Sequence, residues 1–392
     1  MEDIAYVASG STPDKTCFVE NGVPYIKMYN LRNQKIDFAY HPQYITEEVH
    51  NGKLQRSRTE VGDLIMNIVG PPLGKLAIIP TTLPQANFNQ AAVLIRPYKF
   101  KEVLVSYLKV YLEEMSEINS IATRGSAGQV NISLTQSQNM RIPIPPLNEV
   151  RRIIEEVSKY DILIDSLKQN ITDIQNLIAY TKSKILDLAI HGKLVPQDPN
   201  DELAIELLKR INPDFTPCDN GHSRKLPQGW AYCQLSNVLK ITMGQSPKGD
   251  SLNNKRGIEF HQGKICFSDK FLLESGIFTN EPTKIAEPNS ILLCVRAPVG
   301  VVNITKNQIC IGRGLCALTP FEGNVDFYFY LLQTLQDSFD NQSTGTTFKA
   351  ISGEIIRNEN IILPPLAEQQ RIVQKIEELF HVFDNIQNAL EV

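Results

Sequence analysis

The sequence predicts an α+β protein in which two tandem globular α/β domains are joined by two long helices packed as an antiparallel coiled coil. Three observations predict this fold. A heptad repeat of apolar residues follows Pro145-Pro146-Leu147, a shorter one follows Pro364-Pro365-Leu366, and the landmarks of residues 1–142 return in the same order in residues 226–363. The chain is therefore a duplication, in which each globular segment precedes its own helix.

The composition is that of a globular protein long enough for more than one domain. The chain has 392 residues, of which 42% are hydrophobic and 21% charged. No run approaches the roughly 18 apolar residues of a membrane span, and the first residues do not resemble a signal peptide. The seven cysteines are scattered without a Cys-x-x-Cys pair, which favours reduced thiols. We expect a cytoplasmic protein with no membrane partner.

The first globular segment, residues 1–142, alternates short β-rich runs with turns. An apolar period near 3.6 predicts a helix over 103–118. A polar loop over 124–131 precedes the central helix. Strands are expected at 25–28, 63–69 and 91–95, because these runs are bounded by Gly, Pro or Asn.

The central segment, residues 143–192, predicts one long helix with a coiled-coil seam. Apolar residues recur in heptads from Val150 to Leu188, which corresponds to a helix ~58 Å long. Because a lone amphipathic helix cannot bury its own seam, it needs a partner, and residues 364–392 supply one. The predicted seam positions on the two helices are Val157, Ile164, Leu167, Ile171, Ile174, Ile178, Ile376, Leu379, Phe383 and Ile386.

A connector, residues 193–225, leads to the second globular segment, residues 226–363. The connector contains a short predicted helix over 201–210 and then a polar, Pro-rich stretch typical of an interdomain linker. The second segment repeats the first in order: 243–247 corresponds to 9–13, 290–300 to 63–74, 317–320 to 94–97, 326–335 to 103–112, and 344–349 to 125–130.

The charge distribution neither requires nor excludes a nucleic-acid partner. The net charge is −4, yet residues 1–142 carry 14 Lys and Arg against 13 Asp and Glu, and residues 226–363 carry 12 against 12. The acidic excess therefore lies on the helices and the connector. Near-neutral globular domains bind DNA only through local patches.

The motifs of common active sites are missing from the sequence. Residues 70–75 resemble a phosphate-binding loop, but the spacing is one residue short and Leu76 stands where Ser or Thr would hold magnesium. No Asn-Pro-Pro-Tyr or Asp-Pro-Pro-Tyr box for methyl transfer to adenine occurs, and no two histidines have metal-ligand spacing. We expect neither a catalytic residue nor a bound metal.

Polar and basic residues in the loops are candidates for DNA contact. Arg pairs with guanine, and Asn or Gln with adenine, through two hydrogen bonds worth ~1–3 kcal/mol of discrimination. Taken singly, each candidate fits a solvated surface group better. The loops 124–129 and 344–349 combine small residues with a cation, which suits phosphate contact. The candidates are Lys27, Arg32, Arg56, Arg58, Lys75, Asn89, Gln90, Arg124, Gln129, Lys248, Arg256, Arg296, Arg313, Thr346 and Lys349.

Antiparallel packing of the two helices would place the two copies at opposite ends with pseudo-twofold symmetry. The overlap set by the shorter helix, ~40 Å, slightly exceeds one DNA turn of ~34–36 Å. This arrangement suits a bipartite target.

Over essentially the whole chain, the sequence resembles the specificity (S) subunit of type I restriction-modification systems. Residues 144–149 and 363–372 look like its paired helix starts, and residues 186–197 resemble its central region. Residues 226–230 and 295–300 are similar to its target-recognition-domain signatures. One departure is visible: the opening segment of the second copy has no counterpart in the first, so we expect a shortened start or a missing edge element there.

The resemblance implies a non-catalytic subunit that reads a split double-stranded DNA sequence, one half-site per target-recognition domain. It also implies docking of modification (methyltransferase) subunits, expected to be two. These would bind S-adenosylmethionine, whereas this chain would bind no cofactor. A restriction motor-nuclease subunit is a further partner that the resemblance allows. Two alternatives stay open: a two-repeat protein-binding scaffold without DNA readout, and an enzyme in its own right, which the missing motifs disfavour.

Overall fold

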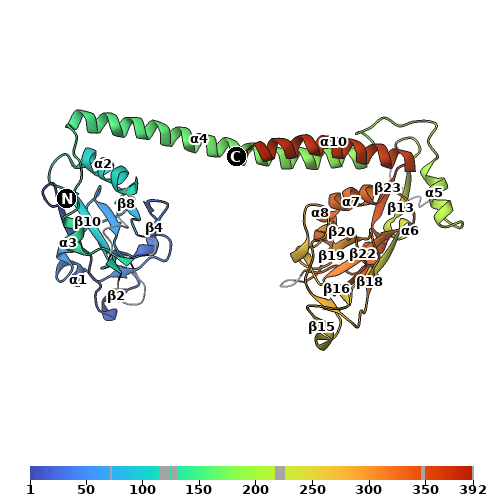
Figure 1. Ribbon diagram of the computed structural model, residues 1–392, viewed down its shortest axis with the longest axis horizontal. Coiled ribbons are helices and arrows are strands. Elements are labelled where there is room, and N and C mark those ends of the chain that lie inside the picture. The colour runs from blue at the N-terminus through green and yellow to red at the C-terminus, as the bar shows by residue number, and fades with distance from the viewer. Residues whose placement is uncertain (71–72, 115–122, 125–129, 217–225, 346–348, 391–392) are drawn as a thin grey trace. The chain divides into compact units, whose positions relative to one another are not determined.

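The chain forms two compact units, Met1–Leu167 and Lys168–Val392, and helix α4 (Leu147–Ile190) contributes residues to both (Figure 1). The five predicted segments divide the chain more finely, and their boundaries stay predictions. The computed structural model describes residues 1–70, 73–114, 123–124, 130–216, 226–345 and 349–390.

Unit 1 is built on an antiparallel sheet with the strand order β1-β10-β7-β8. Helix α2 (Lys101–Glu114) packs against β8 and β10 and buries Leu108 and Leu112. A second sheet has the order β2-β6-β3-β9, in which β3 and β9 are parallel. The strands are β1 Ala5–Ser9, β2 Phe18–Val19, β3 Val23–Ile26, β6 Tyr44–Ile45, β7 Leu64–Asn67, β8 Leu76–Ile78, β9 Asn87–Phe88 and β10 Ala92–Pro97.

Unit 1 also contains several smaller elements. They are the hairpin strands β4 Leu31–Arg32 and β5 Lys35–Ile36, the helices α1 Glu47–Asn51 and α3 Leu134–Gln138, and the paired strands β11 Thr123–Arg124 and β12 Val130–Asn131. Ser133 caps α3 by accepting a hydrogen bond from the Gln136 N–H at 3.1 Å.

Unit 2 repeats this architecture. Its main sheet has the order β14-β22-β19-β20, which is the order of unit 1 with corresponding strands. The second sheet again contains one parallel pair, β16 and β21. The strands are β14 Leu239–Met243, β15 Leu252–Asn253, β16 Ile258–His261, β17 Phe278–Thr279, β18 Ile285–Ala286, β19 Ile291–Cys294, β20 Val302–Ile304, β21 Ile309–Ile311 and β22 Leu315–Pro320.

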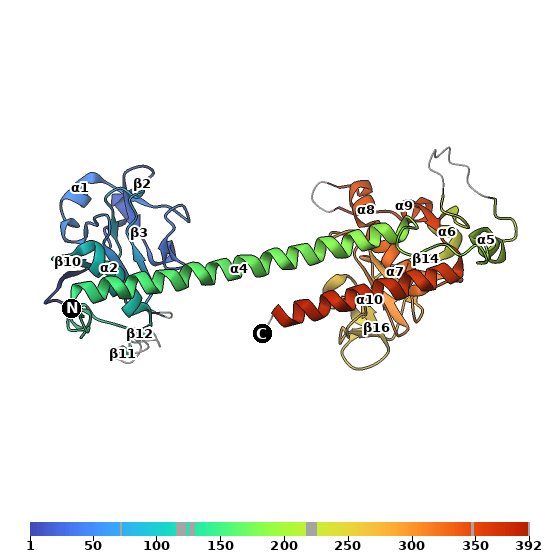
Figure 2. The same ribbon diagram turned by 90° about the horizontal axis from the view of Figure 1, so that it is seen from above.

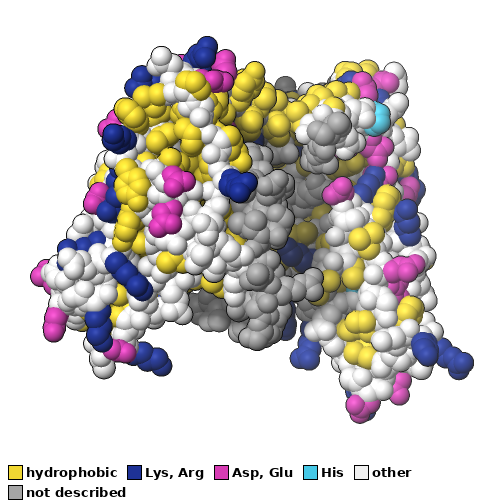
Figure 3. Space-filling view, turned by 60° about the vertical axis from the view of Figure 1, so that its left-hand side comes forward, with side chains coloured by type: hydrophobic (Ala, Val, Ile, Leu, Met, Phe, Trp, Pro, Cys, Tyr) yellow, Lys and Arg dark blue, Asp and Glu magenta, His cyan; other side chains and the backbone are white. Residues whose placement is uncertain are grey.

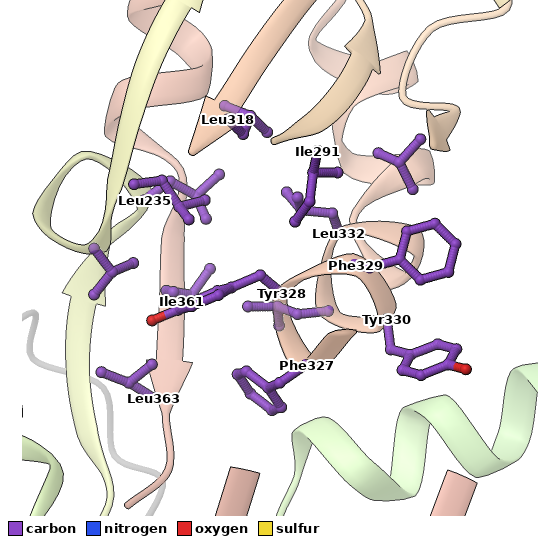
Figure 4. Close-up of a cluster of buried hydrophobic side chains, with 14 of the residues drawn as sticks. Leu235, Ile291, Leu318, Phe327, Tyr328, Phe329, Tyr330, Leu332, Ile361 and Leu363 are labelled. Atoms are coloured by element: carbon purple, nitrogen blue, oxygen red, sulfur yellow. The ribbon is translucent and has the colours of Figure 1, made fainter. Parts of the chain in front are cut away.

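The helices of unit 2 cover the main sheet and pack against the long helices. Helix α7 carries four consecutive aromatic residues, from Phe327 to Tyr330, all buried. In Figure 4, α7 lies opposite Leu235, Ile361 and Leu363, within a single hydrophobic cluster. The helices are α5 Ala204–Ile211, α6 Leu235–Val238, α7 Val325–Thr334, α8 Gln336–Gln342, α9 Gly353–Asn358 and α10 Leu366–Leu390.

The two units differ at one sheet edge. In unit 2, β13 (Ala231–Gln234) pairs with β23 (Asn360–Leu363), directly before α10. In unit 1 the corresponding segment before α4, residues 141–144, is not in a strand, and the amino group of Met1 bonds the Met140 carbonyl at 2.6 Å. This agrees with the expected missing edge element in the first copy.

Within unit 2, the second half of α4 and all of α10 pack antiparallel (Figure 2). The Lys182 ammonium lies 2.6 Å from the Asp384 carboxylate, and Ile185 of α4 belongs to the same core cluster as Ile372 and Ile376 of α10. Gly192 ends α4 with φ +63°, the left-handed conformation that favours glycine. The predicted α+β fold, with two repeated domains and coiled-coil helices, is confirmed.

Candidate nucleic-acid interface

The same set of loops converges at one end of the main sheet in each unit. The Gly10 N–H donates to the Ala92 carbonyl at 3.0 Å in unit 1, and the Gly244 N–H donates to the Leu315 carbonyl at 2.9 Å in unit 2. A Cβ atom at Gly10 would lie 2.1 Å from the Asn89 carbonyl oxygen, and one at Gly244 would lie 2.2 Å from that of Gly312. Only glycine permits these close approaches.

The loop after β9 in unit 1 and the loop after β21 in unit 2 place Gln90 and Arg313 at equivalent positions. The Asn89 N–H donates to the Ile26 carbonyl at 3.1 Å, and the Gly312 N–H donates to the His261 carbonyl at 2.7 Å. The next residues, Gln90 and Arg313, are both exposed. The duplication therefore presents an amide in one unit and a guanidinium in the other, which prefer different bases.

Two further loops join this end of each sheet. Val69 forms an isolated antiparallel bridge with Asn131 in unit 1, and Arg296 forms the equivalent bridge with Ala350 in unit 2. The Ile132 N–H donates to the Ile68 carbonyl at 2.8 Å. In unit 2, the Ile351 N–H correspondingly donates to the Val295 carbonyl at 3.0 Å. Asn131 and Ala350 thus occupy equivalent places in the two units, and we call this end of each main sheet the loop end.

The candidates of unit 1 do not all lie at one place. Asn89 and Gln90 lie at the loop end, while Arg32 and Lys75 line one pocket. Lys27 packs with its ammonium 5.5 Å from the Phe18 ring centroid. Arg56 is exposed. The Arg58 guanidinium donates hydrogen bonds within the fold, to the His50 carbonyl at 3.1 Å and to Asn51 Oδ1 at 2.6 Å. Gln129 and the Arg124 side chain lie outside the described residues.

In unit 2, Arg296 and Arg313 are exposed at the loop end, and Lys248 follows the Gly244 loop. Arg256 is exposed in the segment between β15 and β16. The Lys349 ammonium lies 2.7 Å from the Asp340 carboxylate, so part of its charge is already balanced. Thr346 lies outside the described residues.

The turn after β16 in unit 2 carries exposed residues that the sequence did not reveal as candidates. Gln262 and Lys264 are exposed beside the Arg313 loop, since a Cβ at Gly314 would lie 2.2 Å from the Gln262 carbonyl oxygen. Ile265 is 96% exposed in the same turn. No periodicity signals such a turn, so only the spatial contact between the two loops identifies it.

On the face drawn in Figure 3, apolar side chains form the most continuous area along the top, whereas Lys and Arg side chains are spread over the face among Asp and Glu. The charges on this face are therefore mixed, and DNA contact would depend on individual cations in the loops.

The predicted seam is buried in one half of α4 and exposed in the other. Ile178 is 6% exposed and Ile376 is fully buried, whereas Ile164 is 46% and Leu167 52% exposed. Helix α10 has 25 residues and α4 has 44, so α10 covers only the second half. Of the remaining seam positions, Ile174 and Ile386 are exposed and Val157, Ile171, Leu379 and Phe383 are half-buried.

Among the described residues, no group of three or more His, Cys, Asp or Glu side chains could hold a metal ion. No helix within the described part is long and apolar enough to cross a membrane. Burial raises the pKa of the Cys316 thiol to about 12 and that of the Cys294 thiol to about 11, so both are unreactive core residues.

Comparisons with known proteins agree with this geometry. The family model described as the type I restriction modification DNA specificity domain matches residues 1–176 and 227–392. A putative type I restriction enzyme MjaX specificity subunit from Methanocaldococcus jannaschii is 27% identical over 388 residues, which cover 97% of this chain and 85% of that protein. The EcoAI specificity subunit from Escherichia coli is 25% identical, over 68% of this chain and 58% of its own length.

Solved structures share the fold. A chain from a structure described as the basis of complex assembly and conformational transition of the type I R-M system superposes with a TM-score of 0.62 at 24% identity, covering 100% of this chain and 91% of that one. The HsdS subunit from Thermoanaerobacter tengcongensis superposes with a TM-score of 0.55 at 23% identity, covering 100% and 89%. With a matching family model over both repeats, the chain belongs to the type I restriction-modification specificity subunits, which recognise a DNA target.

Proposed function

We propose that this chain reads a bipartite DNA target, with one half-site for each unit. The repeated loop end is the observation that supports this most directly, because two copies of one reading surface on one chain suit two separate sequences. Gln90 and Arg313 occupy equivalent positions with different hydrogen-bonding groups. The two half-sites should therefore differ in sequence.

The long helices supply the docking surface for the methyltransferase subunits. Large apolar side chains along α4, including Ile162, Leu163 and Leu177, are exposed in the single chain. Contiguous exposed apolar surface on a protein typically marks an interface. We expect two methyltransferase subunits to bind there, to carry S-adenosylmethionine and to flip the target adenine out of the duplex. A motor-nuclease subunit would join the same complex and cleave unmethylated DNA.

A genome-wide map of methylated adenines tests this proposal. Cells that contain the modification partner are compared with and without this chain. A chain-dependent motif of two short half-sites separated by a fixed unread spacer is the expected result. Identical maps would contradict DNA readout and would favour the protein-binding scaffold.

A further inference from the structure

A pocket of about 510 Å³ opens on the β4–β5 hairpin of unit 1. Tyr29, Arg32, Gln34, Tyr40 and Lys75 line it. Two cations and two phenol rings thus meet at one concave site, although they lie up to 46 residues apart in the chain. In the sequence, Arg32 and Lys75 are unrelated candidates, and the fold brings them together.

The hairpin that forms this pocket is held in a fixed conformation. Asn33 has φ +48° and Gln34 has φ +54°, so both turn residues adopt the left-handed conformation of a tight hairpin turn. The Gln34 side-chain oxygen accepts a hydrogen bond from the Leu76 N–H at 2.7 Å, which ties the hairpin to β8. Residues other than glycine rarely adopt this conformation, and such strain is commonly found at functional sites.

Arg32 is oriented by neighbours on two sides. Its guanidinium carbon lies 4.1 Å from the Tyr40 ring centroid, a cation–π distance. Its Nε lies 4.0 Å from one Asp37 oxygen, while the other Asp37 oxygen accepts from the Tyr40 N–H at 3.3 Å. The outer N–H groups of the guanidinium are left for a ligand, since the side chain is 48% exposed.

Lys75 brings a second cation from the loop before β8. Its backbone N–H donates to Asn67 Oδ1 at 2.5 Å, which fixes the start of the side chain. No carboxylate lies within 4.0 Å of its ammonium among the residues that the structure describes. The pocket therefore holds two cations against a single nearby carboxylate.

Unit 2 uses the corresponding segment differently. After the 3-10 turn Lys264–Cys266, the Lys270 ammonium lies 2.7 Å from Glu377 of α10 and 3.0 Å from Asp326 of α7. That cation is thus committed to contacts inside unit 2.

We propose that the pocket formed by Arg32, Tyr40 and Lys75 binds one backbone phosphate of the DNA beside the half-site that unit 1 reads. This inference rests on the proposed function of the chain. A guanidinium can donate two parallel hydrogen bonds to a phosphate, and an ammonium can neutralise it. Phosphate contacts set the register of a protein on the duplex, so the pocket would position the reading loops of unit 1.

Binding of the full chain, assembled with its modification partner, to its own target duplex tests the proposal. The duplexes carry a neutral methylphosphonate at each position of one half-site in turn. The variants are Arg32→Gln, which keeps a long polar side chain, and Lys75→Met. The matched control is Lys35→Met, an exposed lysine on the same hairpin outside the pocket.

We expect each pocket variant to weaken binding about tenfold and to reduce the slope of log K against log salt by about one. At one methylphosphonate position beside the half-site of unit 1, the wild type should lose more affinity than either Arg32→Gln or Lys75→Met, because each variant has already lost one of the two cations that contact this phosphate. Lys35→Met should show no such coupling to any position.

Two outcomes would overturn the inference. In one, the pocket variants keep the circular dichroism spectrum and the thermal melting of the wild type, yet they act additively with every methylphosphonate. In the other, the coupled phosphate lies beside the half-site of unit 2. Either result leaves the proposed function intact if the wild-type complex still methylates a bipartite motif, whereas loss of the motif in the wild type would refute the function itself.

Discussion

Units 1 and 2 have the same sheets but are attached to the long helices in different ways. In unit 2, one core cluster runs from the main sheet through α7 into both long helices, and Lys270 adds one ion pair to Glu377 of α10. In unit 1, the core cluster comprises the sheet, α2 and the segment before α4, and the Tyr107 hydroxyl donates to the Pro143 carbonyl at 2.7 Å. Duplication therefore preserved the loop end while the anchoring diverged.

The connector completes the anchoring of unit 2. The buried Glu368 carboxylate on α10 accepts hydrogen bonds from the Trp230 indole at 3.0 Å and from Gln197 at 3.1 Å. Arg371 pairs with Asp201 at 2.6 Å. The start of α10, the connector and the opening of the second domain are thus locked together. This difference predicts that the two units respond separately to mutation.

The largest effect should come from Phe329→Ala on α7. Phe329 is 1% exposed, and deleting a buried ring costs about 3–5 kcal/mol in the free energy of unfolding. The single tryptophan, Trp230, lies in unit 2, so its fluorescence during denaturant unfolding reports this unit. The control is Leu108→Ala in the core of unit 1. It should leave the Trp230 transition unchanged, and an equal shift would show that the units unfold as one.

Substitutions in the two halves of α4 should differ nearly as much in their effect on the free energy of unfolding. Ile178→Asp places a charge against the α10 partner and should destabilise unit 2 by about 3 kcal/mol. Ile164→Asp, on the exposed half, should change the stability of the isolated chain by less than about 0.5 kcal/mol. It should nevertheless abolish co-purification of the methyltransferase subunit. Retained co-purification would move the docking surface elsewhere.

The glycines of the loop ends should behave alike in both units. Gly10→Ala and Gly244→Ala should each cost about 1–3 kcal/mol, because the new methyl group would overlap a backbone carbonyl. Thermal melting of each variant measures this cost. Gly263→Ala provides the control, since nothing lies within 4 Å of the position that its new Cβ atom would occupy. A harmless Gly10→Ala would mean that the loop end of unit 1 is looser than that of unit 2.

The smallest effect concerns pH and is confined to unit 2. Burial raises the pKa of Glu368 above its ordinary value of 4.5, and the hydrogen bonds from Gln197 and Trp230 oppose this rise. The folded state therefore holds this proton more tightly than the unfolded state. Its stabilising contribution is complete below pH 4.5 and is lost as the pH rises through the folded-state pKa.

The free energy of unfolding of unit 2, measured by Trp230 fluorescence, should therefore fall in the wild type relative to Glu368→Gln between about pH 4 and neutral pH. Unfolding curves at several pH values measure the difference. If the wild type instead gains stability relative to Glu368→Gln as the pH rises, the hydrogen bonds lower the pKa of Glu368 more than burial raises it.

The sequence alone predicted the duplication, the long helices and the family resemblance. Heptads, paired Pro-Pro-Leu starts and ordered landmarks are local or periodic signals, which survive without knowledge of contacts. The sequence also predicted the loops that carry Gln90 and Arg313, because their flanking strands follow a recognisable pattern.

Only the tertiary structure decided which residues share a site. Arg32 and Lys75 meet because the left-handed turn at Asn33 and Gln34 docks on β8, and no spacing rule encodes that contact. The covered length of α4 was likewise undetermined, since a heptad marks an apolar face without naming its partner. Sequence periodicity thus determined which surfaces exist, whereas long-range packing decided which of them are buried, which are free and which act together.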